Sequence, residues 1–223
     1  MIRSDRRTLA LIVAIDGSVR VRAPRCISQH SISRFVDERA AWVVKKRHAA
    51  VLRRQAAPRY ESGEEHPYLG QGVRLAIEAG ERDEARHDGE ALRVTLAGER
   101  SPERVKHAID EWYRAEAARQ LPARLEACWA TFARPGEAMP QLRVRLMHSR
   151  WGSLTAAGRI SLNAYLMRAP AECIDAVIFH ELCHLRVRGH GPEFYRELAR
   201  YVPEWRMRRR QLRGTLHPHT VLA

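Results

Sequence analysis

The stretch FHELCHLRVRGHGPEF, residues 179–194, brings His180, Glu181, His184 and His190 close together in the chain. On a helix, residues four apart lie one turn above each other on the same edge, so the imidazoles of His180 and His184 can bind one metal ion. Glu181 is rotated by about 100° from His180, and its carboxylate can therefore reach a metal-bound water without being a ligand. Zinc lowers the pKa of bound water to about 7, and Glu181 can accept its proton. The stretch predicts a metal-binding helix that carries a general base.

A catalytic zinc needs three protein ligands and one open position, so a third ligand has to be found. His190 follows Gly189, and a glycine at this point can end the helix and turn the chain back beneath the metal. Glu204 is a rival ligand, but the residues on either side of it are typical of a turn and of packing. We therefore expect one zinc ion per chain, held by His180, His184 and His190.

The size and composition are those of a globular protein. The 223 residues, of which 45% are hydrophobic, suit one compact domain or a small domain with an appendage. No apolar stretch approaches the ~20 residues needed to cross a bilayer, so we expect no membrane partner. The four cysteines form no C-x-x-C pair, and a strand explains the short apolar run near the N-terminus better than a secretory signal does. Free thiols and a cytoplasmic location are expected.

The formal net charge is +13, from 39 Lys plus Arg against 26 Asp plus Glu. Such an excess favours a polyanionic partner, nucleic acid first, although a solvated basic surface would give the same charge. Near the end of the last predicted helix, the side chains that could contact phosphates are those of Arg206, Arg208, Arg209, Arg210 and Arg213. A protein that only binds nucleic acid and holds a structural zinc is an alternative, but four ligands usually close such a zinc site.

Apolar periodicity and turn residues predict strands and helices along the whole chain. The predicted strands occupy residues 8–15, 18–24, 73–80, 89–98, 140–153 and 156–166, and residues 58–72 are predicted as a loop. The predicted helices run from Ser28 to 54, from Pro102 onward with a kink or split at Pro122, from Pro170 to Gly189, and over 192–213. We place a boundary near residue 100, between a strand-rich part, 1–100, and the part that holds the motif, 101–223, unless the two form one continuous domain.

A longer segment carries a resemblance to a known family. Residues 149–198, SRWGSLTAAGRISLNAYLMRAPAECIDAVIFHELCHLRVRGHGPEFYREL, resemble the core of the YgjP-like metallopeptidases, which are related to the SprT-like metalloproteases and other compact zincins. The matching parts are an R-W-G-S turn, a short strand that ends in L-N, the H-E-L-x-H helix and a downstream segment around His190. The N-terminal hairpin, the helix after it and the basic C-terminus are similar too. Three positions depart from the family pattern: Leu154, Gly191 and Tyr195.

The resemblance implies an α+β fold: a zincin-like core, in which the HExxH helix packs on a small mixed sheet, preceded by a strand-rich N-terminal part. It also implies that His180, His184 and His190 are the metal ligands and that Glu181 is the base. The function expected from both lines of reasoning is a zinc-dependent hydrolase, a metallopeptidase that acts on polypeptides. An alternative is a metal-dependent hydrolase of a non-peptide substrate such as a nucleotide, although no Gly-rich phosphate loop is found.

Two further residues are candidates for the cleft. Arg150 and Asn163 could line it or stabilise an oxyanion, which a zincin needs in addition to its metal. The competing explanation is structural: Arg150 would belong to a packed turn, and Asn163 would satisfy backbone groups at the end of a strand. The structural explanation is favoured.

Overall fold

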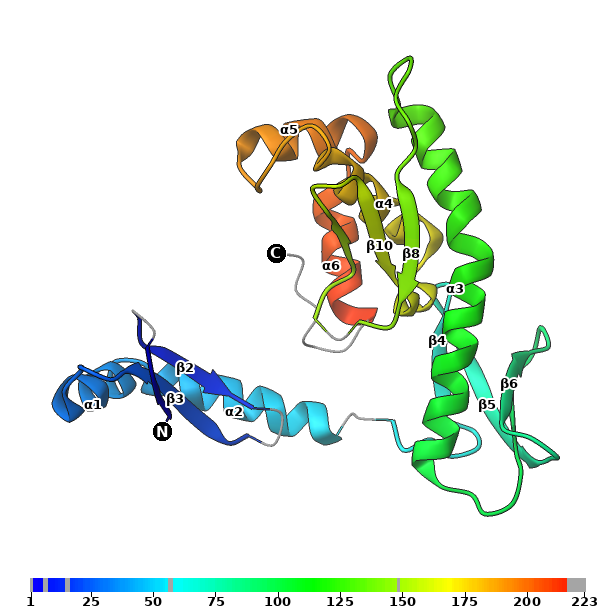
Figure 1. The fold of residues 1–223 in the computed structure, drawn as a ribbon. Helices are drawn as coiled ribbons and strands as arrows, with labels where there is room; N and C mark the ends of the chain where they lie inside the picture. The colour runs from blue at the N-terminus through cyan, green and yellow to red at the C-terminus, as the bar shows by residue number, and fades with distance from the viewer. Residues whose placement is uncertain (1, 6–7, 15–16, 56–57, 148, 216–223) are drawn as a thin grey trace. The chain divides into compact units, whose positions relative to one another are not determined.

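A computed structural model describes residues 2–5, 8–14, 17–55, 58–147 and 149–215. The chain divides into two compact units, residues 1–58 and 59–223, which we call the N-terminal and the C-terminal unit and describe separately. Both contain helices and strands, which confirms the predicted α+β class (Figure 1). No helix in the described ranges is long and apolar enough to cross a membrane.

The N-terminal unit contains a small sheet and two helices. Its strands, in the order β1-β3-β2, are β1 Ile2–Ser4, β2 Ala10–Val13 and β3 Val19–Pro24. β2 and β3 pair as the predicted antiparallel hairpin, whereas residues 15–16 of its turn lie outside the described residues. The helix predicted from Ser28 to 54 is divided into α1 Gln29–Asp37 and α2 Ala40–Gln55. The division occurs where the amide of Arg39 donates to the carbonyl of Val36, three residues back, which tightens the last turn.

The C-terminal unit begins with a four-stranded sheet in the order β4-β5-β7-β6. The strands are β4 Glu65–Tyr68, β5 Gln71–Ala79, β6 Glu84–His87 and β7 Ala91–Leu96. β5 and β7 are the two predicted strands, and they pair in parallel with β6 on the outer side of β7. The prediction of a loop over 58–72 is wrong, because β4 lies within it. β4 pairs with β5 through a turn at Leu69 and Gly70, whose φ values of 47° and 84° are those that a two-residue hairpin loop requires.

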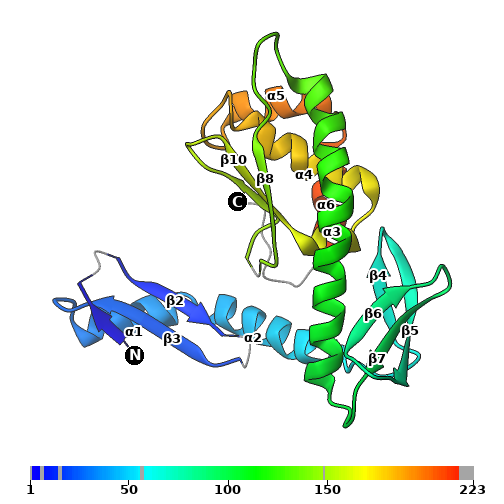
Figure 2. The ribbon, with the colours of Figure 1, turned by 45° about the vertical axis from the view of Figure 1, so that its right-hand side comes forward.

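One long helix connects this sheet to the second half of the unit. α3, Pro102–Phe132, is capped by the Ser101 hydroxyl and starts with a proline, as predicted. It is not split at Pro122, because the buried side chains of Leu121 and Leu125 on either side keep the helix packed against the core. α3 packs on β6 and β7 near its start and on β8 and α4 further along (Figure 2). The predicted boundary near residue 100 therefore falls inside the C-terminal unit.

The second sheet and the helices on it form the part that holds the motif. The strands, in the order β8-β10-β9, are β8 Gln141–Arg145, β9 Gly152–Leu154 and β10 Arg159–Asn163. This sheet is mixed, since β10 is parallel to β8 and antiparallel to β9. A short 3₁₀ helix η1, Ala164–Arg168, leads to α4 Ala171–Cys183, α5 Pro192–Tyr201 and α6 Trp205–Thr215. The single final helix predicted over 192–213 breaks at Pro203, which has no amide hydrogen to continue α5.

Candidate metal centre

Three histidine side chains from two neighbouring segments converge at the C-terminal end of α4. His180 lies in the last turn of the helix, His184 is its C-terminal cap, and His190 comes from the loop before α5. One ligand atom from each of the three lies within 4.8 Å of the others, and the Nε2 atoms of His180 and His190 are 3.0 Å apart. The sequence-predicted set is therefore brought together, in a spacing that one metal ion can bridge.

Hydrogen bonding and burial leave these rings ready to bind a cation. Nδ1 of His184 lies 3.2 Å from the carbonyl oxygen of Val187, so the bond to this carbonyl fixes the ring and leaves Nε2 for the ion. Burial, together with the charges of His184, His190 and Arg209, lowers the pKa of His180 to about 3. His180 is thus neutral at pH 7, which is the form that binds metals. Three imidazole nitrogens are a ligand set that fits Zn²⁺.

The loop between His184 and His190 is shaped by a tight turn and held by an arginine. α4 ends at Cys183, before the predicted end at Gly189, because the amides of His184, Leu185 and Arg186 each bond three residues back. Gly189 instead has a φ of 81°, a left-handed conformation that favours glycine and turns the chain before His190.

Arg186 connects this loop to the helices on both sides. Its Nη2 donates to the carbonyl of Phe132 at 2.6 Å, at the end of α3, and lies 3.4 Å from Glu137. Its Nη1 lies 3.7 Å from Glu197 on α5. The turn that presents His190 is therefore fixed to two other elements.

The fully buried ring of Phe194, on α5, lies against all three histidines. Its centroid is 4.8 Å from that of His180, 4.6 Å from that of His184 and 4.9 Å from that of His190. An aromatic ring in contact with all three imidazoles restricts their rotation. This contact between Phe194 and the histidines could not be inferred from the spacing of the histidines in the sequence, because it depends on where α5 docks.

Glu181 lies beside the histidines and is almost completely buried, with 5% of its surface exposed. Burial raises the pKa of this carboxyl to about 8, although the nearby charge of Arg150 and a hydrogen bond from the Leu154 backbone act in the opposite direction. Gly152, on β9, lies against the carboxylate: a Cβ there would be 2.6 Å from Oε1 of Glu181. β9 thus approaches the glutamate as closely as only a glycine allows.

A cleft opens beside these groups and is lined by residues 149–154 together with His180, Glu181, His184 and His190. Arg150 lines this cleft and is exposed, which fits the expected role in the cleft better than the expected role in a packed turn.

Asn163 is not among the residues that line the cleft and is fully buried at the end of β10. Its Oδ1 accepts from the amides of Met147 and Tyr165, both at 3.1 Å. Its Nδ2 donates to the carbonyls of Met147 at 2.7 Å and Arg150 at 2.9 Å. The side chain thus satisfies backbone groups and holds the segment that carries Arg150.

The rival ligand and the basic side chains near the C-terminus lie elsewhere. The histidine cluster, as far as the described residues show, does not include Glu204, which is exposed and pairs with Arg208 at 3.1 Å. The guanidinium of Arg206 lies over the Trp205 ring, 4.7 Å from its centroid, and Arg210 is exposed.

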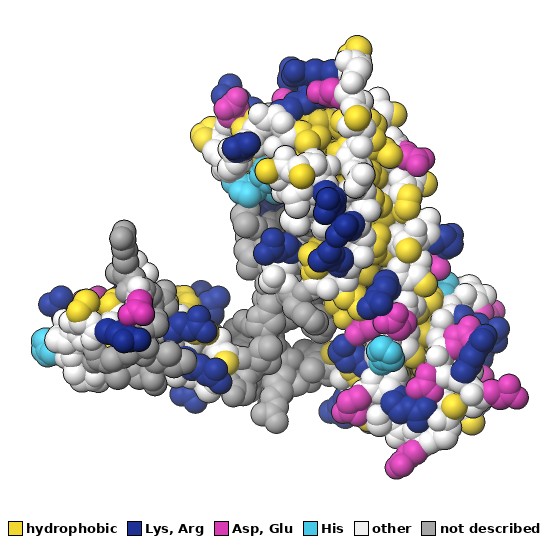
Figure 3. All heavy atoms as spheres, in the orientation of Figure 1, with side chains coloured by type: hydrophobic (Ala, Val, Ile, Leu, Met, Phe, Trp, Pro, Cys, Tyr) yellow, Lys and Arg dark blue, Asp and Glu magenta, His cyan; other side chains and the backbone are white. Residues whose placement is uncertain are grey.

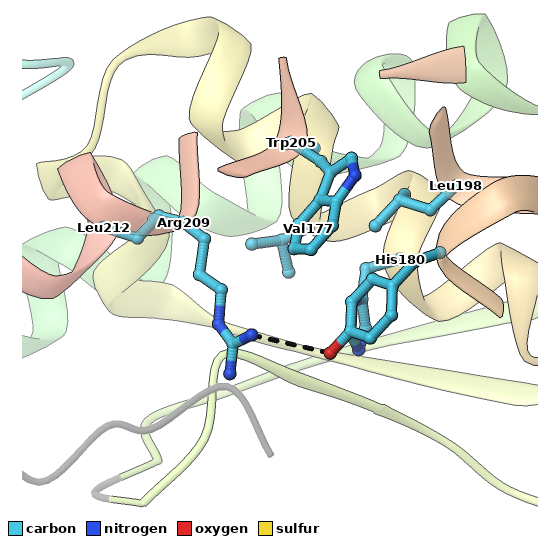
Figure 4. A pocket seen from close by; sticks show the side chains of 8 residues that line it. Val177, His180, Leu198, Trp205, Arg209 and Leu212 are labelled. Atoms are coloured by element: carbon cyan, nitrogen blue, oxygen red, sulfur yellow. Dashed lines mark hydrogen bonds between the residues drawn. The ribbon is translucent and has the colours of Figure 1, made fainter. Parts of the chain in front are cut away.

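The other two arginines of this group are Arg213 and Arg209. The side chain of Arg213 lies outside the described residues. Arg209 is half-buried and faces His180, on whose pKa its charge acts (Figure 4). The helical spacing that placed Arg209 with Arg206 and Arg210 could not reveal this, because the spacing does not show how α6 docks.

Known proteins were compared with the whole chain. A family model described as "YgjP-like, metallopeptidase domain" matches residues 7–215. No curated protein sequence matches the chain significantly. A solved structure that is similar is the crystal structure of the metallopeptidase zymogen of Pyrococcus abyssi abylysin, with 19% identity and a TM-score of 0.40. That similarity covers 46% of this chain and 100% of the other.

Proposed function

The chain belongs to the YgjP-like metallopeptidase family, and from this we propose that it is a zinc-dependent peptidase with Glu181 as its general base. The observation that carries the proposal is the convergence of His180, His184 and His190 beside this buried carboxylate. Three imidazoles hold a zinc ion and leave one coordination position open, which is the ligand number of a catalytic rather than a structural site.

The protein's own groups supply the proton transfer. When bound, the ion acts as a Lewis acid and makes water a better nucleophile. Glu181, whose pKa is about 8 in the metal-free site, can take a proton from the attacking water and give it to the departing amine. A dication nearby favours the ionised carboxylate, so the base is ready when the site is loaded. Gly152 leaves room for that carboxylate, and Arg150 on the cleft wall is placed to contact the substrate.

The sheet beside the cleft supports a polypeptide substrate. β9 is the edge strand of the order β8-β10-β9, and its residues 152–154 line the cleft. The Leu154 backbone also bonds to Glu181, so this edge faces the catalytic side. An extended peptide can add to such an edge through main-chain hydrogen bonds, which bring its carbonyl groups past the metal centre.

The test compares wild type with Glu181→Gln, both loaded with zinc, on an unfolded protein and on a nucleoside triphosphate. Glu181→Gln removes the proton acceptor and no ligand, so zinc content should remain and cleavage of the unfolded protein should fall by several orders of magnitude. Equal cleavage by both proteins would remove Glu181 from the mechanism. Hydrolysis of the nucleotide but not of the polypeptide would replace the peptidase with a nucleotide hydrolase.

A second candidate, recruitment to nucleic acid, is favoured by the charge of the N-terminal unit. Residues 1–58 contain 13 of the 39 Lys and Arg but only four of the 26 Asp and Glu. On the face of this unit that Figure 3 shows, basic side chains (dark blue) cover more of the surface than acidic ones (magenta). Clustered cations of this kind bind phosphate backbones in a salt-dependent, sequence-tolerant way. We propose this unit, rather than the arginines of α6, as the nucleic-acid contact.

A further inference from the structure

The N-terminal unit leaves a tryptophan ring exposed on its longer helix. Trp42 lies in the first turn of α2 with 41% of its surface exposed, and Val44, on the opposite side of the helix, has 67% exposed. Among the described residues of this unit, only Ala23, Pro24 and Ile32 are buried. A single exposed apolar side chain is ordinary, so the surroundings of the ring decide what it can bind.

Cationic residues lie before and after this ring along one helix face. The ammonium of Lys46 lies over the ring of Trp42, 5.8 Å from its centroid. This distance is near the limit of a cation–π contact, so the ammonium can turn to a phosphate at small cost. Arg39 lies directly before α2, and its carbonyl accepts the amide of Val43 at 2.9 Å, which continues the helix backward. Since residues three and four apart share a face, Arg39, Trp42 and Lys46 form one row.

Most of the positive charge around Trp42 has no acidic partner. Glu38 forms an ion pair with Arg39 at 3.3 Å. Lys45, Lys46 and Arg47 are exposed, and no carboxylate of the described residues forms an ion pair with any of them. Free cations attract a polyanion, and an aromatic ring between them offers a surface on which a flat, apolar group can stack.

We propose that the N-terminal unit binds single-stranded nucleic acid, with one base stacked on Trp42 and the adjoining phosphates on Lys45, Lys46 and Arg47. This inference rests on the proposed recruitment to nucleic acid and names the form that is bound. The bases of a single strand are open to stacking, and an aromatic ring accepts any of them. A duplex keeps the faces of its bases inside the stack and offers its phosphates and base edges, so it would leave the ring of Trp42 without a partner.

The test measures binding of the full-length protein by fluorescence anisotropy at several salt concentrations. The probes are a labelled oligothymidylate of about 20 nucleotides and a labelled duplex of about 20 base pairs. We expect the single strand to bind more tightly, although contacts with phosphates alone would favour the duplex, whose charge density is higher. Trp42→Ala should weaken single-strand binding about 5- to 150-fold, which is the worth of one stacked base.

Two control variants separate stacking from other effects. Trp42→Phe keeps an aromatic ring and should retain most of the affinity for the single strand. Val44→Ala removes a more exposed apolar side chain from the opposite side of α2 and should change neither affinity. Trp42→Ala should also leave duplex binding and the salt dependence of single-strand binding unchanged, because stacking releases no counterions.

Several results would overturn the inference. Tighter binding of the duplex, or single-strand binding that Trp42→Ala does not weaken, would reduce the contact to phosphates; recruitment to nucleic acid would survive and only the inference would fail. An equal loss of both affinities in Trp42→Ala would show that the ring does not select open bases. A dimer that Trp42→Ala dissociates, or a larger loss of thermal stability than in Val44→Ala, would show that the ring packs against protein. Wild-type protein that binds neither probe at low salt would refute the recruitment itself.

Discussion

Replacing Gly152 with alanine tests the placement of Glu181, the proposed general base. The added Cβ would lie 2.6 Å from Oε1 and 2.7 Å from Cγ of Glu181, whereas ordinary contacts begin at 3.4 Å. The carboxylate must therefore move by about 0.8 Å, the difference between 3.4 Å and 2.6 Å, or β9 must move away from α4. A displacement of about 1 Å at a reacting group costs roughly 100-fold in rate, which is about 2.7 kcal/mol in the barrier.

The assay is cleavage of an internally quenched peptide, with zinc content measured by elemental analysis. We expect kcat/KM of Gly152→Ala to fall about 100-fold while one zinc per chain is retained, because the three atoms nearest to the added methyl group all belong to Glu181. Gly191→Ala is the matched control: it adds the same methyl group next to His190 in the chain, where no atom beyond the two neighbouring residues lies within 4 Å and φ is −75°. Full activity of Gly152→Ala, or an equal loss in Gly191→Ala, would show that the contact between residue 152 and Glu181 does not position the carboxylate.

Three other features of the chain can be tested: the third metal ligand, the raised pKa of Glu181 and the basic N-terminal unit. His190→Ala should lose the zinc, and Glu204→Gln should keep it; the reverse result would identify Glu204 as the third ligand. In metal-free protein, Glu181→Gln should be more stable than wild type at pH 7 by roughly 3 kcal/mol, and the difference should vanish near pH 4. Folding raises the pKa of Glu181 from 4.5 to about 8, so the wild type loses stability relative to the variant as the pH rises through that interval. Thermal unfolding at several pH values measures the difference, and a difference that does not change with pH would contradict this prediction. Lys45, Lys46 and Arg47 are exposed on α2 of the N-terminal unit. Changing all three to glutamine should weaken DNA binding and flatten its salt dependence more than Arg210→Gln does. Equal effects of the two changes would show that the N-terminal unit is not the DNA contact.

The parts of the site that the sequence could predict are those set by local spacing. His180 and His184 lie on one edge of α4 because they are four residues apart, whatever the helix packs against. The glycine before His190 takes the left-handed conformation expected of a turn. The helix nevertheless ends six residues before Gly189, because the turn after His184 is stabilised by contacts of Arg186 with distant segments.

The parts that could not be predicted depend on how distant segments dock. β4 was missed because its hairpin turn contains Leu69, a residue that rarely adopts positive φ, in place of the usual Asn or Asp. Gly152 and Phe194 contact the motif only after β9 and α5 have packed on α4. Arg209 faces His180 because α5 ends before Pro203 and α6 begins as a separate helix, which helical spacing alone does not reveal.

We propose that three imidazoles and no other protein group hold one zinc ion beside Glu181. Zinc X-ray absorption spectroscopy on protein that has never been exposed to a chelator tests it most directly. We predict one zinc per chain with three nitrogen ligands and one oxygen ligand at about 2.0–2.1 Å. A sulfur ligand near 2.3 Å, a fourth imidazole, or the absence of stoichiometric zinc would show that His180, His184 and His190 do not form a three-histidine zinc site.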